Sequence, residues 1–186
     1  MILRPVVPER PLLWPPIVER LQAVLGDAPV YIVGGAVRDA YLYRPLKDLD
    51  LAGPSDGRPL ARQIANALRG AYYPLDAERG IGRALVTWEG QEITVDVAKY
   101  RGSDLLADLT LRDFTVNAMA VSLAGELQHV VDPLGGLDDL QAKRLRQCTP
   151  QAIADDPVRS LRAVRLSIAL GLLIEASTRR SLRAHA

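Results

Sequence analysis

Two aspartates, Asp48 and Asp50, stand at positions i and i+2 of the segment DLDLA. In a β-strand these positions project from the same face, so the two carboxylates repel each other unless a cation lies between them. Mg²⁺ is a cation that prefers such oxygen ligands. A polar strand face exposed to solvent shows the same pattern, and for an isolated pair of aspartates that interpretation is the better one.

A third carboxylate changes this balance. Asp96 interrupts an apolar segment, directly between Val95 and Val97. If its strand pairs beside the strand that carries Asp48 and Asp50, three carboxylates converge and can hold two divalent ions about 4 Å apart. Such a site aligns an attacking hydroxyl with a leaving pyrophosphate. For Asp96 taken alone, a surface carboxylate on an edge strand is an equally good interpretation.

A glycine pair, Gly34 and Gly35, separates the apolar segment 30–33 from a helical pattern over 36–42. Glycines allow backbone N–H groups to approach a polyphosphate closely, and a helix N-terminus adds partial positive charge. Arg38, one turn later, adds a fork of donors for phosphate oxygens. The spacing of a P-loop is absent. By itself, a glycine pair at such a junction is usually turn chemistry.

The elements that position these residues form an α+β pattern. Residues 101–108 and 133–136 have the composition of loops. Apolar periodicity predicts strands over 30–33, 48–52, 72–75, 83–88, 92–99 and 127–131, and helices over 17–25, 36–42, 60–68, 113–120 and 157–170. The pattern predicts a small mixed sheet with flanking helices in residues 1–140, followed by a helical region in 141–186. The helical pattern at the end of the chain suggests a fragment of a longer protein.

Composition narrows the function classes. With 186 residues, 48% apolar and 24% charged, the chain resembles a globular domain. It has no apolar run of about 18 residues, and its first residues are interrupted by proline and charge, so we expect neither a membrane span nor a signal peptide and place the protein in the cytoplasm. One cysteine and two histidines exclude an internal disulfide and leave too few ligands for a structural zinc site.

The net charge of +1 hides an asymmetry along the chain. Residues 1–140 contain 14 Lys or Arg and 19 Asp or Glu, whereas residues 141–186 contain 9 and 3. An acidic body followed by a basic helical segment is one form that a nucleic-acid interaction takes in a sequence. A solvated helix face is the simpler explanation, and charge alone favours it.

Taken together, the motifs resemble a known family. GGAVRD followed by DLDLA is similar to the signature of the class II tRNA nucleotidyltransferase and poly(A) polymerase family, within the polymerase β-like superfamily. Four further segments agree in order and spacing: TVDVAKYR, LRDFTVNAMAV, DPLGGLDDLQAKRLR and DDPVRSLRAVRLSIALG. The resemblance extends over residues 30–171. It implies a polymerase β-like nucleotidyltransferase head, residues 1–140, and the start of a helical neck, residues 141–186.

The resemblance also implies roles for individual residues. Asp48 and Asp50 would bind Mg²⁺, and Asp96 would help to activate the 3′-hydroxyl of the primer. Arg112 would assist the glycine turn with the triphosphate, and Asp113 would contact the ribose. The nucleotide-binding set is Gly34, Gly35, Arg38, Arg112, Asp113, Asn117, Asp156, Arg159 and Arg162. One departure is Leu111, which stands where the family usually has arginine.

Asp156 and Arg159 match the family's base-reading pair. Residues at i and i+3 share a helix face, so one carboxylate and one guanidinium could address the Watson–Crick edge of a base. An ordinary ion pair within a helix, worth about 0.3–0.5 kcal/mol, is the alternative.

The implied activity is template-independent addition of AMP and/or CMP, from ATP or CTP, to an RNA 3′ end, with tRNA as the expected RNA. The alternative is a nucleotide- or RNA-binding module that keeps the fold with little or no turnover. The sequence leaves open CCA, CC, A-only and poly(A) addition, and the oligomeric state. We expect weak RNA affinity for the chain alone, because its basic segment offers few phosphate contacts.

Overall fold

A seven-stranded mixed sheet forms the centre of the protein in the computed structural model, which describes residues 4–185. The strand order is β3-β4-β5-β2-β1-β6-β7. β2 and β5 are parallel, and the other neighbours in the sheet are antiparallel. The strands are β1 Tyr31–Val33, β2 Asp48–Gly53, β3 Ala71–Asp76, β4 Ile81–Trp88, β5 Gln91–Lys99, β6 Ala120–Ser122 and β7 Val130–Val131. The predicted α+β class with a mixed sheet is confirmed.

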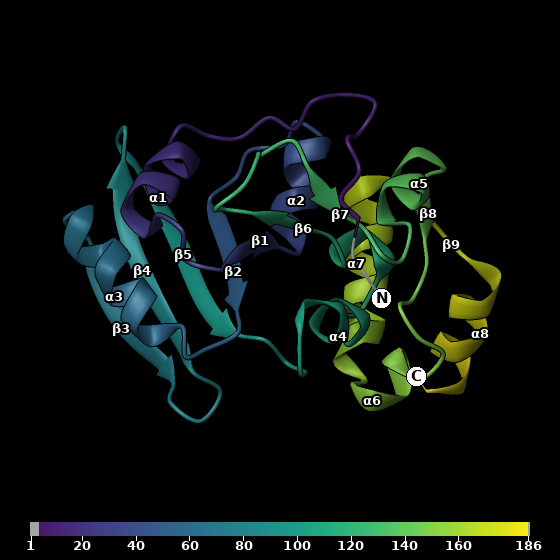
Figure 1. Cartoon of the computed structure of the whole chain (residues 1–186). Coiled ribbons are helices and arrows are strands. Elements are labelled where there is room, and N and C mark those ends of the chain that lie inside the picture. The colour runs from purple at the N-terminus through teal and green to yellow at the C-terminus, as the bar shows by residue number, and fades with distance from the viewer. Residues whose placement is uncertain (1–3, 186) are drawn as a thin grey trace.

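Helices cover the sheet and form a second mass beside it (Figure 1). α3 packs on β3, β4 and β5, and α1 packs on α3. Helices α4 to α8 gather at the other end, where β8 Arg144–Leu145 and β9 Leu173–Ile174 form a short parallel pair. The helices are α1 Ile17–Leu25, α2 Gly35–Tyr41, α3 Arg58–Ala67, α4 Leu105–Thr110, the 3₁₀ turn η1 Thr115–Asn117, α5 Gly136–Gln141, α6 Ala152–Asp155, α7 Val158–Leu170 and α8 Ala176–Ala184.

Local sequence accounts for several of these boundaries. Proline suits the start of a helix, and Pro16 and Pro157 directly precede α1 and α7. Gly171 ends α7 in the left-handed conformation, with φ +63°, which a glycine adopts without steric cost. In β2, Leu49 and Leu51 are buried, while Asp48 and Asp50, which alternate with them, face outward.

One hydrophobic core joins the sheet to the C-terminal helices. Ile32 and Leu49 of the sheet belong to the same buried cluster as Leu145, Ile153 and Leu166. The division into parts at residue 140 stays a prediction, and the outermost residues of those parts, 1–3 and 186, lie outside the described residues. No helix in the described range is long and apolar enough to cross a bilayer.

Four element predictions need correction. The predicted helix over 113–120 is the short η1 followed by the start of β6, because the whole segment is buried and its last residue, Ala120, pairs with β1. The loop predicted over 101–108 contains the start of α4, whose N-terminus is capped by the Asp104 side chain. The strand predicted over 127–131 is limited to β7, and α5 begins within the predicted loop 133–136.

Candidate nucleotide site

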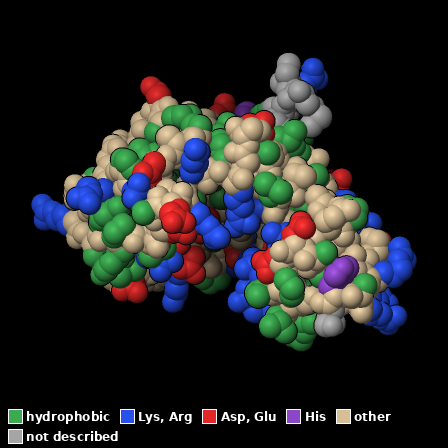
Figure 2. All heavy atoms as spheres, turned by 90° about the horizontal axis from the view of Figure 1, so that it is seen from below, with side chains coloured by type: hydrophobic (Ala, Val, Ile, Leu, Met, Phe, Trp, Pro, Cys, Tyr) green, Lys and Arg blue, Asp and Glu red, His purple; other side chains and the backbone are tan. Residues whose placement is uncertain are grey.

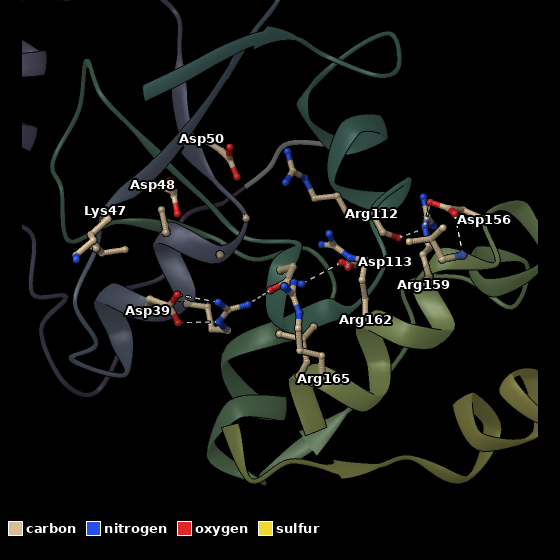
Figure 3. A pocket seen from close by; sticks show the side chains of 18 of the residues that line it. Asp39, Lys47, Asp48, Asp50, Arg112, Asp113, Asp156, Arg159, Arg162 and Arg165 are labelled. Carbon is tan, nitrogen blue, oxygen red and sulfur yellow. Dashed lines mark hydrogen bonds and ion pairs between the residues drawn. The ribbon is translucent and has the colours of Figure 1, made fainter. Parts of the chain in front are cut away.

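Adjacent parallel strands bring the three acidic residues to one face of the sheet. In the β2–β5 register, Asp50 lies opposite Asp96 and Asp48 lies opposite Thr94. Paired residues on neighbouring strands point to the same face, and Asp48 and Asp50 share a face because they are two residues apart. Both point into the pocket (Figure 3). The strand pairing that the sequence argument required is therefore present.

Asp96 differs from the other two because it is engaged by an arginine. Arg83, its cross-strand neighbour on β4, donates from Nε to Oδ1 at 2.7 Å and from Nη2 to Oδ2 at 2.8 Å. Within residues 4–185, no three His, Cys, Asp or Glu side chains lie close enough together to bind one metal ion without other ligands. The third carboxylate thus lies beside the pair but is already bound to a protein cation.

Within residues 4–185, the side-chain carboxylates of Asp48 and Asp50 accept no hydrogen bond and form no ion pair, and both residues bond to the neighbouring strands through their backbone. Burial raises the pKa of Asp50, the Arg112 guanidinium offsets part of that rise, and the Asp96 and Asp48 carboxylates add to it. Two neighbouring carboxylates whose ionisation is opposed in this way are a donor set that favours a cation. Mg²⁺ is usually held by one or two carboxylates together with substrate phosphates, and this donor set fits that ion.

The glycine turn lies directly against these acids. Gly34 has φ +74°, a conformation that glycine adopts readily. A Cβ atom added at Gly34 would lie 2.9 Å from Nη1 of Arg112 and 3.7 Å from Oδ2 of Asp50. Only a residue without a side chain therefore allows the backbone, the arginine and the aspartate to come this close.

A polar pocket of about 500 Å³ opens in front of the turn. The space-filling view shows the surface hollowed between the two masses of the molecule, with Lys and Arg side chains gathered around the hollow (Figure 2). Asp48 and Asp50 lie on one wall, and arginines of the segment after α4 and of α7 lie on the other (Figure 3). Every predicted site residue except Asp96 lines this pocket: Gly34, Gly35, Arg38, Asp48, Asp50, Arg112, Asp113, Asn117, Asp156, Arg159 and Arg162.

A chain of hydrogen bonds connects α2 to α7 along the floor of the pocket. Arg38 donates to Oδ1 of Asn117 at 2.5 Å, and Asn117 donates to Oδ1 of Asp113 at 3.0 Å. Oδ2 of Asp113 accepts from Nε of Arg162 at 2.8 Å. Burial alone would raise the pKa of Asp113, but the Arg162 guanidinium and the bonds from Asn117 and the Phe114 amide outweigh it and lower that pKa.

The predicted geometry of Asp156 and Arg159 needs a correction. Asp156 has an extended backbone and precedes α7, so the two residues do not share a helix face. Nε of Arg159 lies 3.6 Å from Oδ2 of Asp156, while its terminal nitrogens donate to the backbone carbonyls of Leu111, Arg112 and Ala152. Arg159 is thereby fixed against the end of α4.

Several functional candidates escaped the sequence argument. Lys47, Arg101 and Arg165 line the pocket, and their only sequence signals were proximity to DLDLA, to Asp96 and to the α7 arginines. A second pocket of about 840 Å³ adjoins the first and is lined by Asp96. The two pockets share Asp50, Arg101, Arg112 and Asp156.

Comparison with known proteins agrees with this geometry. The model of the poly(A) polymerase head domain matches residues 30–105 and 100–146. The CC-adding tRNA nucleotidyltransferase of Geobacter sulfurreducens is 42% identical over 153 residues, which cover 82% of this chain and 35% of that protein. The A-adding tRNA nucleotidyltransferase of Deinococcus radiodurans is 39% identical over 152 residues, 82% of this chain and 33% of that protein. The chain thus spans about a third of the length of these relatives.

Solved structures show the same similarity. The Thermotoga maritima CCA-adding enzyme complexed with tRNA aligns with a TM-score of 0.79 at 32% identity, over 92% of this chain and 42% of that one. A tRNA nucleotidyltransferase complexed with a primer tRNA and an incoming ATP analogue aligns with a TM-score of 0.77 at 31% identity, over 90% of this chain and 49% of that one. The resemblance noted in the sequence motifs is confirmed.

Proposed function

The chain belongs to the poly(A) polymerase head-domain family of nucleotidyltransferases, and from this membership we propose that it transfers AMP and/or CMP from ATP or CTP to an RNA 3′ end, with tRNA as the RNA, and releases pyrophosphate. The observation that carries the proposal is the pair Asp48 and Asp50, which face an arginine-lined pocket from beside a glycine turn. A cytoplasmic location is part of the proposal.

The nucleotide is assigned to the first pocket. Its triphosphate lies against the turn at Gly34 and Gly35, where Arg38 and Arg112 supply guanidinium donors for phosphate oxygens. Asp113 contacts the ribose, and Arg162 holds that carboxylate in its charged form. Asp156 and Arg159 face the base, with Arg159 oriented by the carbonyl oxygens at the end of α4.

The RNA end is assigned to the second pocket. An attacking hydroxyl must approach the α-phosphate from the side opposite the leaving pyrophosphate, and the second pocket meets the first at Asp50. Asp96 lines this side only, which suits a carboxylate that assists the attacking 3′-hydroxyl. Catalysis then rests mainly on the positioning of two substrates and on charge stabilisation.

Asp48 and Asp50 are the residues that would hold Mg²⁺, and a second ion would require Asp96 to share its oxygens with Arg83. The bound metal supplies charge neutralisation at the phosphates and alignment of the two reacting oxygens. The protein contributes the β2–β5 strand pair, which fixes the carboxylates. It also contributes arginines, which screen the remaining phosphate charge. The choice among CCA, CC, A-only and poly(A) addition is left to the experiment.

The proposal is tested by Mg²⁺-dependent incorporation of labelled CMP and AMP into tRNA that lacks its 3′ end. Asp48→Ala and Asp50→Ala are expected to abolish incorporation, and Glu19→Ala, an exposed change on α1 away from both pockets, serves as the control with wild-type activity. An unchanged rate in either active-site variant would refute the assignment. Tight Mg²⁺-dependent ATP or CTP binding by the wild type, with no pyrophosphate released in the presence of tRNA, would instead favour the binding module.

A further inference from the structure

α4 carries a buried carboxylate for which the proposed reaction has no direct use. The Asp108 side chain is 2% exposed. Its Oδ2 accepts hydrogen bonds from Nε and Nη2 of Arg112, at 3.1 and 2.8 Å. Its Oδ1 accepts from the backbone amide of Arg101 at 3.0 Å, directly beyond the end of β5. One buried group therefore ties the Arg112 guanidinium to the end of the strand that carries Asp96.

The guanidinium of Arg112 has one side bound and one side free. Nε and Nη2 are taken by Asp108, and within the described part of the chain Nη1 has no acceptor. Nη1 is also the atom nearest to the space above Gly34. Arg112 lines both pockets where they meet at Asp50. The free side of the fork thus faces the place where a phosphate oxygen would lie.

A second consequence concerns Asp50. Nη1 of Arg112 and Oδ2 of Asp50 both lie beside Gly34, and their opposite charges attract each other. A guanidinium without another partner would be drawn into a direct ion pair with Asp50, which would occupy a carboxylate that the metal requires. Asp108 binds Arg112 from the opposite side of the guanidinium, so the Asp50 carboxylate stays free to bind a metal ion.

We propose that Asp108 is a positioning residue, which holds Arg112 in the one orientation where Nη1 can donate to the triphosphate of the incoming nucleotide. The proposal rests on the proposed function, because it requires that Arg112 contacts the phosphates of ATP or CTP. Asp108 acts through Arg112 and touches no substrate itself.

The test is Asp108→Asn, with the Kd of CTP and of CMP measured by titration calorimetry in Mg²⁺. Asparagine keeps the size of the side chain and can still accept from the Arg101 amide, but its NH₂ group faces the donors of Arg112. We expect the Kd of CTP to rise about tenfold, the loss typical of a misaligned charge-assisted hydrogen bond. The Kd of CMP should stay within about twofold, because Arg112 acts on the outer phosphates.

A double-mutant cycle separates positioning from general support of the fold. In an Arg112→Gln background, Asp108→Asn should cause no further loss of CTP affinity. The matched control is Asp104→Ala, which removes the cap of the same helix without touching Arg112, and should leave the Kd of CTP at the wild-type value. Equal losses in both backgrounds, an equal loss for CMP, or the same loss in Asp104→Ala would overturn the proposal.

A second variant, Arg112→Lys, tests the same proposal even if the Asp108→Asn protein does not fold. An ammonium group can neutralise Asp108, but it cannot bind the carboxylate through two donors and also hold a phosphate oxygen in a fixed direction. We expect its CTP affinity to fall nearly as far as in Arg112→Gln, and wild-type affinity would overturn the proposal. Wild-type protein that binds neither CTP nor ATP would contradict the proposed function itself, which distinguishes the two failures.

Discussion

The charge of Asp50, which would hold the metal ion in the proposed reaction, is disfavoured in the folded protein. Burial and the neighbouring carboxylates hold its folded pKa above the ordinary value, so the protonated form is favoured in the folded state. The stabilising contribution of such a group is present below its unfolded pKa and is lost as pH rises through the folded pKa. At neutral pH the ionised group therefore destabilises the metal-free protein, and a bound cation reverses that effect.

We expect Asp50→Asn to raise the Tm of the metal-free protein while it abolishes nucleotide incorporation. Asp50 is exposed at the wall of the pocket, so solvent screens part of this effect, and we expect a rise of no more than roughly 2–4 °C, which corresponds to about 1 kcal/mol for a chain of this size. Thermal unfolding in EDTA measures the gain, and added Mg²⁺ should raise the Tm of the wild type more than that of the variant. A lower Tm for the variant in EDTA would show that the Asp50 charge is compensated in the folded state. Glu92→Gln, an exposed change on β5, is the control.

The sequence revealed the acidic residues of the site more readily than their partners. Asp48 and Asp50 were recognisable because the strand period places them on one face. Arg83 binds Asp96 through two donors only because the β4–β5 register places the two residues opposite each other. The alternation of apolar residues predicts which face a residue occupies, but it does not predict which residues pair. The contact between Arg112 and Asp108 was equally hidden, because it depends on a helix that sequence reasoning placed in a loop.

At the scale of elements, sequence patterns identified the long periodic segments and failed at the short ones. α7 and the β4–β5 hairpin were predicted nearly to their observed bounds. The helix predicted over 113–120 was wrong. This segment is buried throughout, with η1 packed on α2 and α5, so it lacks the alternation of one buried and one exposed face that a helix prediction requires. Asp104 before Leu105 was a cap signal that could have located α4.

The DPLGGLDDL segment has a structural role in this fold. Oδ1 and Oδ2 of Asp132 accept from the amides of Gly136 and Leu137 at the start of α5. The fully buried Asp139 accepts hydrogen bonds from Thr115 and from Arg144 and Arg146 around β8. These contacts tie η1, which carries Asn117, to the C-terminal region, so the motif positions the site without entering the pocket.

The contact between Asp113 and Arg162 joins α7 to the segment that follows α4, and it makes the association of these elements sensitive to acid. The folded pKa of Asp113 is lowered, so its stabilising contribution is present above the unfolded value of 3.8 and is lost as pH falls through the folded pKa. We expect Asp113→Asn to cost on the order of 1–2 kcal/mol at pH 6. That cost should shrink below about pH 4, where the wild type loses the same contribution. Urea unfolding of both proteins at pH 6 and pH 3.5 measures it, and a cost that is equal at the two pH values would contradict the expectation.

At the scale of the whole molecule, the basic C-terminal segment is less available to RNA than its composition suggests. Asp139 forms ion pairs with both Arg144 and Arg146, Asp113 pairs with Arg162, and Arg159 faces Asp156 and backbone carbonyls. Within residues 4–185, the basic residues of this segment that form no ion pair are Lys143, Arg165, Arg179, Arg180 and Arg183. Much of the positive charge is therefore used inside the protein to build the pocket.

We expect this chain to bind tRNA with a Kd in the micromolar range or weaker at physiological salt. About five available cations predict a slope of roughly −3 to −4 in a plot of log K against log salt concentration, since each phosphate contact with single strands contributes about 0.7. Replacing Arg179, Arg180 and Arg183 on α8 with alanine should make that slope shallower by about 2, whereas Arg20→Ala on α1 should leave it unchanged. Filter binding over a salt series measures both, and nanomolar affinity at physiological salt would show that surfaces other than these cations grip the RNA.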